Sequence, residues 1–107
     1  MLPIRYLTSN PSKRFEVNEM EKEFFAAFEL KWPPEALPFV HLIRMSDGTL
    51  AFEYGRAPIG KIKLQGRKHS MQVLRGLTSQ SHIFGSMEDF IAGIDKWIVY
   101  YKKHLRH

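Results

Sequence analysis

The chain has 107 residues, a length typical of one domain, and we expect a single domain over residues 1–107. Its residues are 44% hydrophobic and 13% aromatic, a composition that is typical of globular proteins and excludes a disordered chain. It contains no cysteine, and this excludes a disulfide framework and cysteine-ligated zinc or iron–sulfur sites. The formal net charge of +5 makes it a basic protein and favours anionic partners such as nucleic acid.

The opening stretch, MLPIRYLTSNPSKRF, lacks the apolar segment of a secretory signal peptide. It is basic and free of acid, so a mitochondrial presequence stays open as an alternative. No apolar run approaches the roughly 18 residues of a membrane span, and no membrane partner is expected. We therefore expect an intracellular, cytoplasmic protein.

A first helix is predicted within residues 12–30. Asn18 followed by Glu21 has the pattern of a capping box, although a start after Asn10-Pro11 is an alternative. Apolar residues at helical spacing form one stripe: Val17, Met20, Phe24, Ala27 and Phe28. The stretch KWPPEALP ends the helix with three prolines in eight residues, and its Trp32 could pack inside or stand exposed.

Residues 39–75 are predicted to form four short antiparallel strands in a meander. FVHLIRM and LAFEYG flank SDGT, whose Asp-Gly pair is a hairpin signal. Pro58 is expected to break the chain before the alternating segment IGKIKLQ, in which Ile62 and Leu64 face the core. GRKH then makes a turn into the fourth strand, SMQVLR, with Met71 and Val73 inward.

The segment GLTSQSHIFG reads as a ten-residue loop before the last helix. That helix begins at Ser86, which forms a capping-box pattern with Asp89. Gly93 in its middle costs about 1 kcal/mol relative to Ala, which a close approach to the sheet or to a second chain would explain. Its apolar stripe is Met87, Phe90, Ile91, Ile94, Trp97, Ile98, Tyr101 and Leu105.

These elements predict an α+β fold: a four-stranded antiparallel meander between an N-terminal and a long C-terminal helix, in the order α-β-β-β-β-α. A meander followed by a helix is similar in topology to whirly-type single-strand-binding modules, and a helix before the sheet resembles a double-stranded RNA-binding domain. The last helix begins with the acidic Ser86-Met87-Glu88-Asp89, where the second group has lysines. Both similarities are of topology alone and carry no residue roles.

Enzymatic chemistry finds little support in the sequence. None of the five histidines has a metal-ligand spacing, and no nucleophile, P-loop or dinucleotide motif occurs. A nuclease-like set of Asp47, Glu53 and Lys61 or Lys63 lies on neighbouring predicted strands, but Asp47 is explained by its turn and Glu53 has no second acid beside it. We expect no catalytic residues, no metal and no cofactor.

The segment GRAPIGKIKLQGRKHSMQVLRG carries the strongest functional signal, because no acid occurs between Glu53 and Glu88. If Ile62 and Leu64 are buried, Lys61 and Lys63 project together from the opposite face. Tyr54, His41 and Trp32 are candidate stacking surfaces if their side chains face the same way. The candidate nucleic-acid-binding residues are Arg56, Lys61, Lys63, Arg67, Lys68, His69, Gln72 and Arg75.

The sequence thus predicts a non-enzymatic nucleic-acid-binding protein, with single-stranded DNA or RNA favoured over duplex. The alternative is an interaction or assembly module, a dimeric adaptor or regulator, that binds an acidic protein. Val99 and Tyr100 fall outside the main stripe of the last helix and predict a homodimer. A third alternative is that the basic segment only keeps an exposed sheet soluble.

Overall fold

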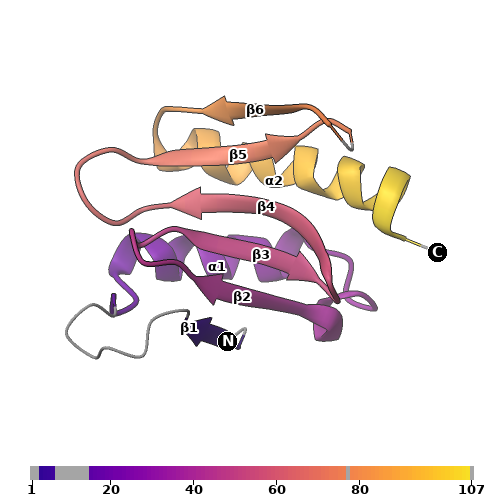
Figure 1. Ribbon diagram of the computed structural model, residues 1–107, viewed down its shortest axis with the longest axis horizontal. Helices are drawn as coiled ribbons and strands as arrows, with labels where there is room; N and C mark the ends of the chain where they lie inside the picture. Colours follow the sequence, from indigo (N-terminus) through magenta and orange to yellow (C-terminus); the bar gives the residue numbers. More distant parts are fainter. Residues whose placement is uncertain (1–2, 7–14, 77, 107) are drawn as a thin grey trace.

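The computed structural model describes residues 3–6, 15–76 and 78–106. Two helices lie side by side behind one twisted sheet, so the other side of the sheet faces the viewer uncovered in Figure 1. A short 3-10 turn precedes β2, and a π-helical turn, Tyr101–Leu105, continues the second helix. The elements are β1 (Ile4–Tyr6), α1 (Glu19–Lys31), β2 (Val40–Arg44), β3 (Leu50–Tyr54), β4 (Ala57–Lys63), β5 (Ser70–Leu74), β6 (Gln80–Ile83) and α2 (Met87–Tyr100).

The sheet is mixed, and its strand order, β1-β2-β3-β4-β5-β6, is the order of the chain. Only β1 and β2 are parallel; the other neighbours are antiparallel. The α+β class and the long C-terminal helix are confirmed. The expected four-stranded α-β-β-β-β-α arrangement is wrong, because the sheet has six strands and one of them precedes α1.

The two strands that the sequence pattern failed to predict are the edges of the sheet. Three-residue β1 is too short for a periodic signal, and its pairing with β2 spans the whole of α1. The segment GLTSQSHIFG is not a continuous loop, because four of its ten residues, Gln80–Ile83, form β6. Its polar composition hid it: only Ser81 and Ile83 share the helix-side register with Val73 and Met71.

Pro58 does not break the chain, and this expectation is wrong. It lies exposed within β4, opposite Glu53, where the register of the β3–β4 pair shifts. Because β5 pairs only with residues 60–63 of β4, the missing N–H of Pro58 removes no bond to that neighbour. The register shift leaves Ile59 as the extra residue, fully buried.

The core lies between the sheet and the helices. Trp32 packs inside, with its ring stacked on Phe28 at a centroid distance of 4.9 Å. The predicted capping box of α1 is confirmed: Asn18 Oδ1 accepts the Glu21 N–H at 2.8 Å, and Glu21 Oε1 accepts the Asn18 N–H at 3.1 Å. The helix therefore begins at Glu19; the alternative start after Asn10-Pro11 lies outside the described residues.

Gly93 lies against the sheet. A Cβ at Gly93 would come within 2.5 Å of Met71 Sδ, so only a residue without a side chain lets α2 approach β5 this closely. Gly60 likewise lets α2 lie close to β4, because a Cβ at this position would overlap the Trp97 indole. Trp97 Nε1 in turn donates to the Gln72 carbonyl at 2.8 Å, which fixes α2 to the backbone of β5.

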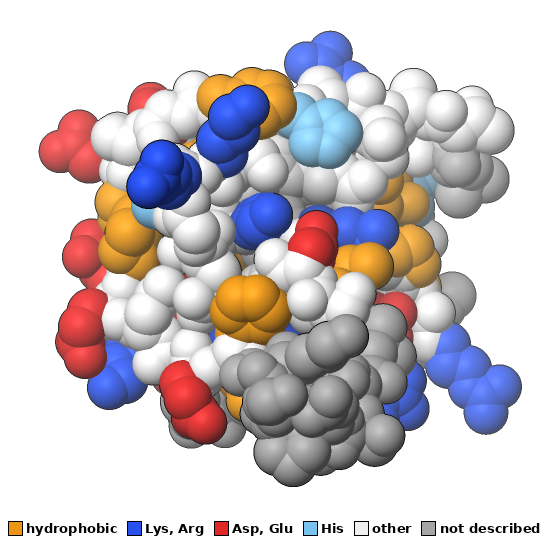
Figure 2. All heavy atoms as spheres, turned by 60° about the vertical axis from the view of Figure 1, so that its left-hand side comes forward, with side chains coloured by type: hydrophobic (Ala, Val, Ile, Leu, Met, Phe, Trp, Pro, Cys, Tyr) orange, Lys and Arg blue, Asp and Glu red, His pale blue; other side chains and the backbone are white. Residues whose placement is uncertain are grey.

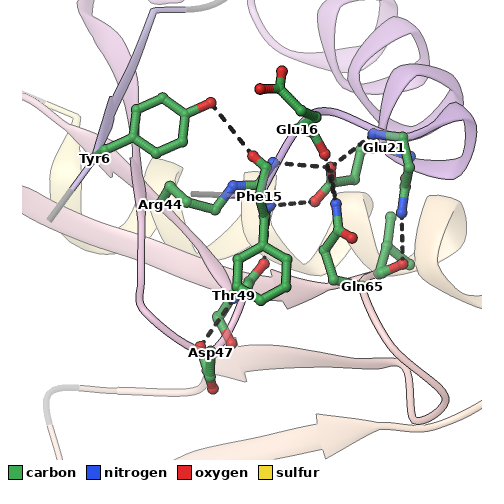
Figure 3. Close-up of polar contacts among 11 residues, drawn as sticks. Tyr6, Phe15, Glu16, Glu21, Arg44, Asp47, Thr49 and Gln65 are labelled. Carbon is green, nitrogen blue, oxygen red and sulfur yellow. Dashed lines mark hydrogen bonds and ion pairs between the residues drawn. The ribbon is translucent and has the colours of Figure 1, made fainter. Parts of the chain in front are cut away.

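A buried ion pair ties α1 to β2 (Figure 3). Arg44 Nη1 and Nη2 donate to the two carboxylate oxygens of Glu21 at 2.6 and 3.0 Å, and both side chains are fully buried. Gln65 Nε2 also donates to Glu21 Oε1 at 2.9 Å, and the Gly48 carbonyl accepts from Arg44 Nη1 at 2.9 Å. These partners link the helix to both hairpin turns at one end of the sheet.

Candidate nucleic-acid interface

The uncovered side of the sheet, here called the open face, carries one continuous row of side chains across all six strands. Each residue of the row lies directly opposite the next, and every second residue along a strand belongs to this side. The row is Arg5, Ile43, Ala51, Lys61, Gln72 and His82. Ile43 is buried, whereas Arg5, Lys61 and His82 are exposed. The half of the row from β4 to β6 is therefore polar and basic.

Shorter rows flank this one. Lys63 lies opposite Ser70, two residues from Lys61 along β4. On the other side, His41 Nε2 and Glu53 Oε1 are 3.0 Å apart, so the Glu53 carboxylate on this face is engaged by its neighbour. Lys61 lies in the row next to that of Glu53, and Lys63 lies one row further away.

A cavity of about 200 Å³ opens on this face between the β2–β3 hairpin and strands β4 to β6. Lys61, Lys63, Gln72 and His82 line it, together with Asp47 and Thr49 of the hairpin. The pKa of Asp47 is held below its ordinary value, first by the backbone N–H of Thr49, at 3.0 Å, and further by the charge of Lys63. Among the described residues Lys61 has no ion-pair partner, so its charge is available to a ligand.

The structure brings three of the predicted residues, Lys61, Lys63 and Gln72, together at this cavity. Arg67 and Lys68 are exposed in the turn that follows β4, where His69 Nε2 lies 3.0 Å from the Gly66 carbonyl.

Arg56 and Arg75 lie at the opposite end of the sheet, because Arg56 precedes β4 and Arg75 follows β5. Seven-residue β4 spans about 20 Å, which separates the two groups. The end of the molecule with the β2–β3 and β4–β5 turns shows Lys and Arg side chains dispersed over it rather than merged into one patch (Figure 2).

Two of the expected stacking residues are on the wrong side. Trp32 is buried in the core, and Tyr54 shares the helix side, where its ring packs against Tyr101 at 5.0 Å. His41 lies on the open face but is engaged by Glu53. The sequence reasoning missed His82 and the exposed Phe84, because it placed both in a loop. The sequence signal that could have revealed β6 was the alternation of the two sides along residues 80–84, in which Gln80, His82 and Phe84 share one side and Ser81 and Ile83 the other.

A groove of about 370 Å³ runs between the end of β5 and the outer side of α2. Its floor includes Leu74, Tyr100 and Val99, the last 52% exposed, and the one acid beside it, Asp95, accepts a hydrogen bond from Lys31 Nζ at 3.2 Å. Of the two residues expected to lie outside the core stripe, Val99 is exposed and Tyr100 is buried. The rim is basic: Arg75, Lys96, Lys103 and His104.

Neither a metal site nor a membrane span emerges from the part of the chain that the structure describes. No three His, Asp or Glu side chains gather there as ligands would, and no helix is both long and apolar enough to cross a bilayer. The nuclease-like set is also separated: Asp47 caps the hairpin turn through Thr49, whereas Glu53 pairs with His41 near the far end of β3.

The fold and this site define a basic α+β protein with a six-stranded mixed sheet open on one side. Comparison with family models, curated proteins and solved structures gave no match.

Proposed function

We propose that the protein binds single-stranded nucleic acid on its open face without catalysing a reaction. The observation that carries this proposal is the cavity at which Lys61 and Lys63 meet Gln72 and His82 on a sheet face without a covering helix among the described residues. Lysine ammonium groups neutralise phosphates, and Gln and His side chains donate and accept hydrogen bonds.

The spacing of the lysines suits an extended strand. Lys61 and Lys63 are two residues apart on β4, and at a rise of about 3.3 Å per residue their Cα atoms lie about 6.6 Å apart. Each can meet its own phosphate along a single strand. Arg67 and Lys68 then continue the path beyond the end of β4. A sheet face offers no helix or ribbon to enter a duplex groove, which favours an unpaired strand.

The test compares two variants that each lose four positive charges. In the first, Lys61, Lys63, Arg67 and Lys68 are changed to Ala; in the control, Lys96, Lys102, Lys103 and Arg106 are changed to Ala on and after α2. Affinity for labelled single-stranded DNA and RNA is measured at several salt concentrations. The log–log salt slope of the first variant should be smaller by up to about 2.8, at about 0.7 per lost phosphate contact, and its affinity should fall by orders of magnitude at low salt.

The control variant should retain most of the parent's affinity and its salt slope. Equal losses in both variants would show a general charge effect and contradict a site on the open face. A folded first variant that binds as tightly as the parent would reduce the basic segment to a solvated surface. Both variants should keep their thermal stability, because exposed substitutions change it by within about 0.5 kcal/mol.

The groove between β5 and α2 supports a second candidate, an interaction module for an acidic protein. An apolar floor with a rim of four basic side chains is complementary to an acidic chain that carries apolar residues. A second copy placed there by two-fold symmetry would bring Lys96 and Lys103 of both copies together, so the charges favour a different partner over the expected homodimer.

Binding of a labelled amphipathic peptide of Leu and Glu tests this candidate. Charge reversal at Lys96 and Lys103, both to Glu, should abolish binding of the peptide, while the open-face variant should keep it. Failure of the parent to bind the peptide, together with a concentration-dependent dimer in sedimentation, would instead assign the groove to a second copy.

A further inference from the structure

Phe84 has an exposure that packing does not explain. It follows β6 directly, and its side chain is 74% exposed. Its ring is nearly parallel to that of His82, with centroids 6.3 Å apart and an angle of 27° between the ring planes. An aromatic ring left in water forfeits the burial that would stabilise the fold, so this pair presents a flat apolar surface to the solvent.

The position of the pair connects it with the phosphate path. His82 lies opposite Gln72 on the open face and lines the cavity shared with Lys61 and Lys63. Gln72 is held in place, because its Nε2 donates to Gln80 Oε1 at 2.6 Å. Strand β6 is also the last in the sheet, and an edge strand has backbone donors and acceptors without a neighbouring strand. His82 thus lines the cavity, and Phe84, directly after β6, lies beside this row of hydrogen-bonding groups.

We propose that Phe84 and His82 form a stacking platform for one unpaired nucleobase, at the end of the path that begins at the lysines of β4. This inference rests on the proposed function, and it names the part of the ligand that the lysines do not recognise. A base flanked by its own phosphates can lie on the Phe84 ring while Lys61 and Lys63 hold the backbone. Bases in a duplex are already stacked and paired, so the platform selects single strands.

Phe39 offers a matched comparison. It is also exposed, at 59%, but its ring meets Tyr54 edge-to-face at the end of the sheet where β2 begins. It lines neither the cavity nor the row across the open face. Loss of Phe39 therefore removes a similar ring from the surface without touching the proposed base site.

The experiment uses a thymidine decamer and a decamer of the same length with abasic sugars, so that the phosphates are equal and only the bases differ. Phe84→Ala should weaken binding of the thymidine decamer by about fivefold to a hundredfold, the range for one lost stacking contact. It should leave the abasic decamer and the salt slope unchanged. Phe84→Trp keeps an aromatic ring and should bind the thymidine decamer about as tightly as the parent. Phe39→Ala should bind both decamers with the parent's affinity.

Two results would overturn the platform. In the first, Phe84→Ala binds both decamers like the parent, while the variant with Lys61, Lys63, Arg67 and Lys68 changed to Ala loses affinity. This result would contradict the platform and leave the proposed function intact. An equal loss on both decamers would show that Phe84 acts through the fold or the phosphates instead. If the parent binds neither decamer, the proposed function fails, and the platform fails with it.

Discussion

The two faces of the sheet use the same strands for opposite purposes. In β2, Leu42 and Arg44 point toward the helices and are fully buried, whereas His41 between strand residues 40 and 42 is half-buried on the open face. Each face carries a basic side chain in contact with a carboxylate: Arg44 with Glu21 on the helix side, and His41 with Glu53 on the open side. Arg44 and His41 both belong to β2. The two pairs therefore differ in stability mainly through their burial and the groups around them.

Because Arg44 and Glu21 are both buried, removing one of them should destabilise the protein strongly, whereas replacing both with apolar residues should not. Taking two charges out of water carries a large penalty, which their mutual attraction and the added bonds from Gln65 and Asn18 offset. The His41–Glu53 pair keeps its contact with water and gains less. Arg44 and Glu21 are therefore held in one arrangement, whereas His41 and Glu53 can exchange their mutual contact for contacts with water.

The largest predicted effect comes from splitting the buried pair. Glu21→Ala leaves the Arg44 guanidinium buried without its carboxylate and should destabilise the protein by about 3–5 kcal/mol. Glu53→Ala on the open face should cost less than about 1 kcal/mol, because a pair that keeps its contact with water contributes little. Urea denaturation of the two variants measures both values. Similar values would contradict the contrast between the faces.

Replacing both buried partners sharpens the same comparison. The double variant Glu21→Leu with Arg44→Met should recover most of the stability lost by Glu21→Ala, since no unpaired charge remains. A double variant as unstable as the single one would show that the bonds of Arg44 to the Gly48 carbonyl, rather than the unpaired charge, dominate.

A smaller loss is expected from the apolar part of the helix face. Ile94 of α2 is fully buried, and Ile94→Ala should destabilise by about 2–5 kcal/mol through lost burial and a cavity. Lys61→Ala, on the exposed side of β4, should stay within about 0.5 kcal/mol. A change for Ile94→Ala as small as that of Lys61→Ala would place this side of α2 outside the core.

The smallest effect concerns Asp47 at the hairpin beside the cavity. Its pKa is lowered, chiefly by the Thr49 N–H, so its charged form stabilises the folded state. That contribution is fully present above the ordinary carboxyl value of 3.8 and is lost as the pH falls through the lower folded pKa. Asp47→Asn should therefore be less stable than the parent at neutral pH, and the difference should shrink below about pH 4. Thermal unfolding at several pH values follows this, and a pH-independent difference would argue against it.

Sequence alone was sufficient for the elements with a strong pattern. The capping box of Ser86 located the start of α2, that of Asn18 was one of two alternatives for the start of α1, and the Asp-Gly pair located the β2–β3 hairpin. Alternation around Ile62 correctly placed Lys61 and Lys63 together on the outer side. These features are local, so neighbouring residues contain the information that determines them.

The features that sequence did not reveal depend on distant partners. Strand β1 is defined only by its pairing with β2, and polar β6 only by its place beside β5. Because β6 is not predicted, the sequence does not assign His82 and Phe84 to a face of the sheet. Trp32 and Tyr54 are then the candidate stacking residues. Pro58 was misread because a register shift, rather than its own conformation, makes room for it in β4.

The strand order bears on how the chain folds. From β2 to β6 every pair of neighbours in the sheet is also consecutive in the chain, and the connections run from residues 55–56 at the shortest to 64–69 at the longest. Short connections cost little loop-closure entropy, so this meander can form hairpin by hairpin, at a rate set by local contacts. Strand β1 pairs with β2 across the whole of α1, so this pairing closes a longer connection than any hairpin of the meander and is expected to form late. The N-terminal strand is therefore the last part of the sheet to join and the first to detach, and hydrogen exchange should be fastest there.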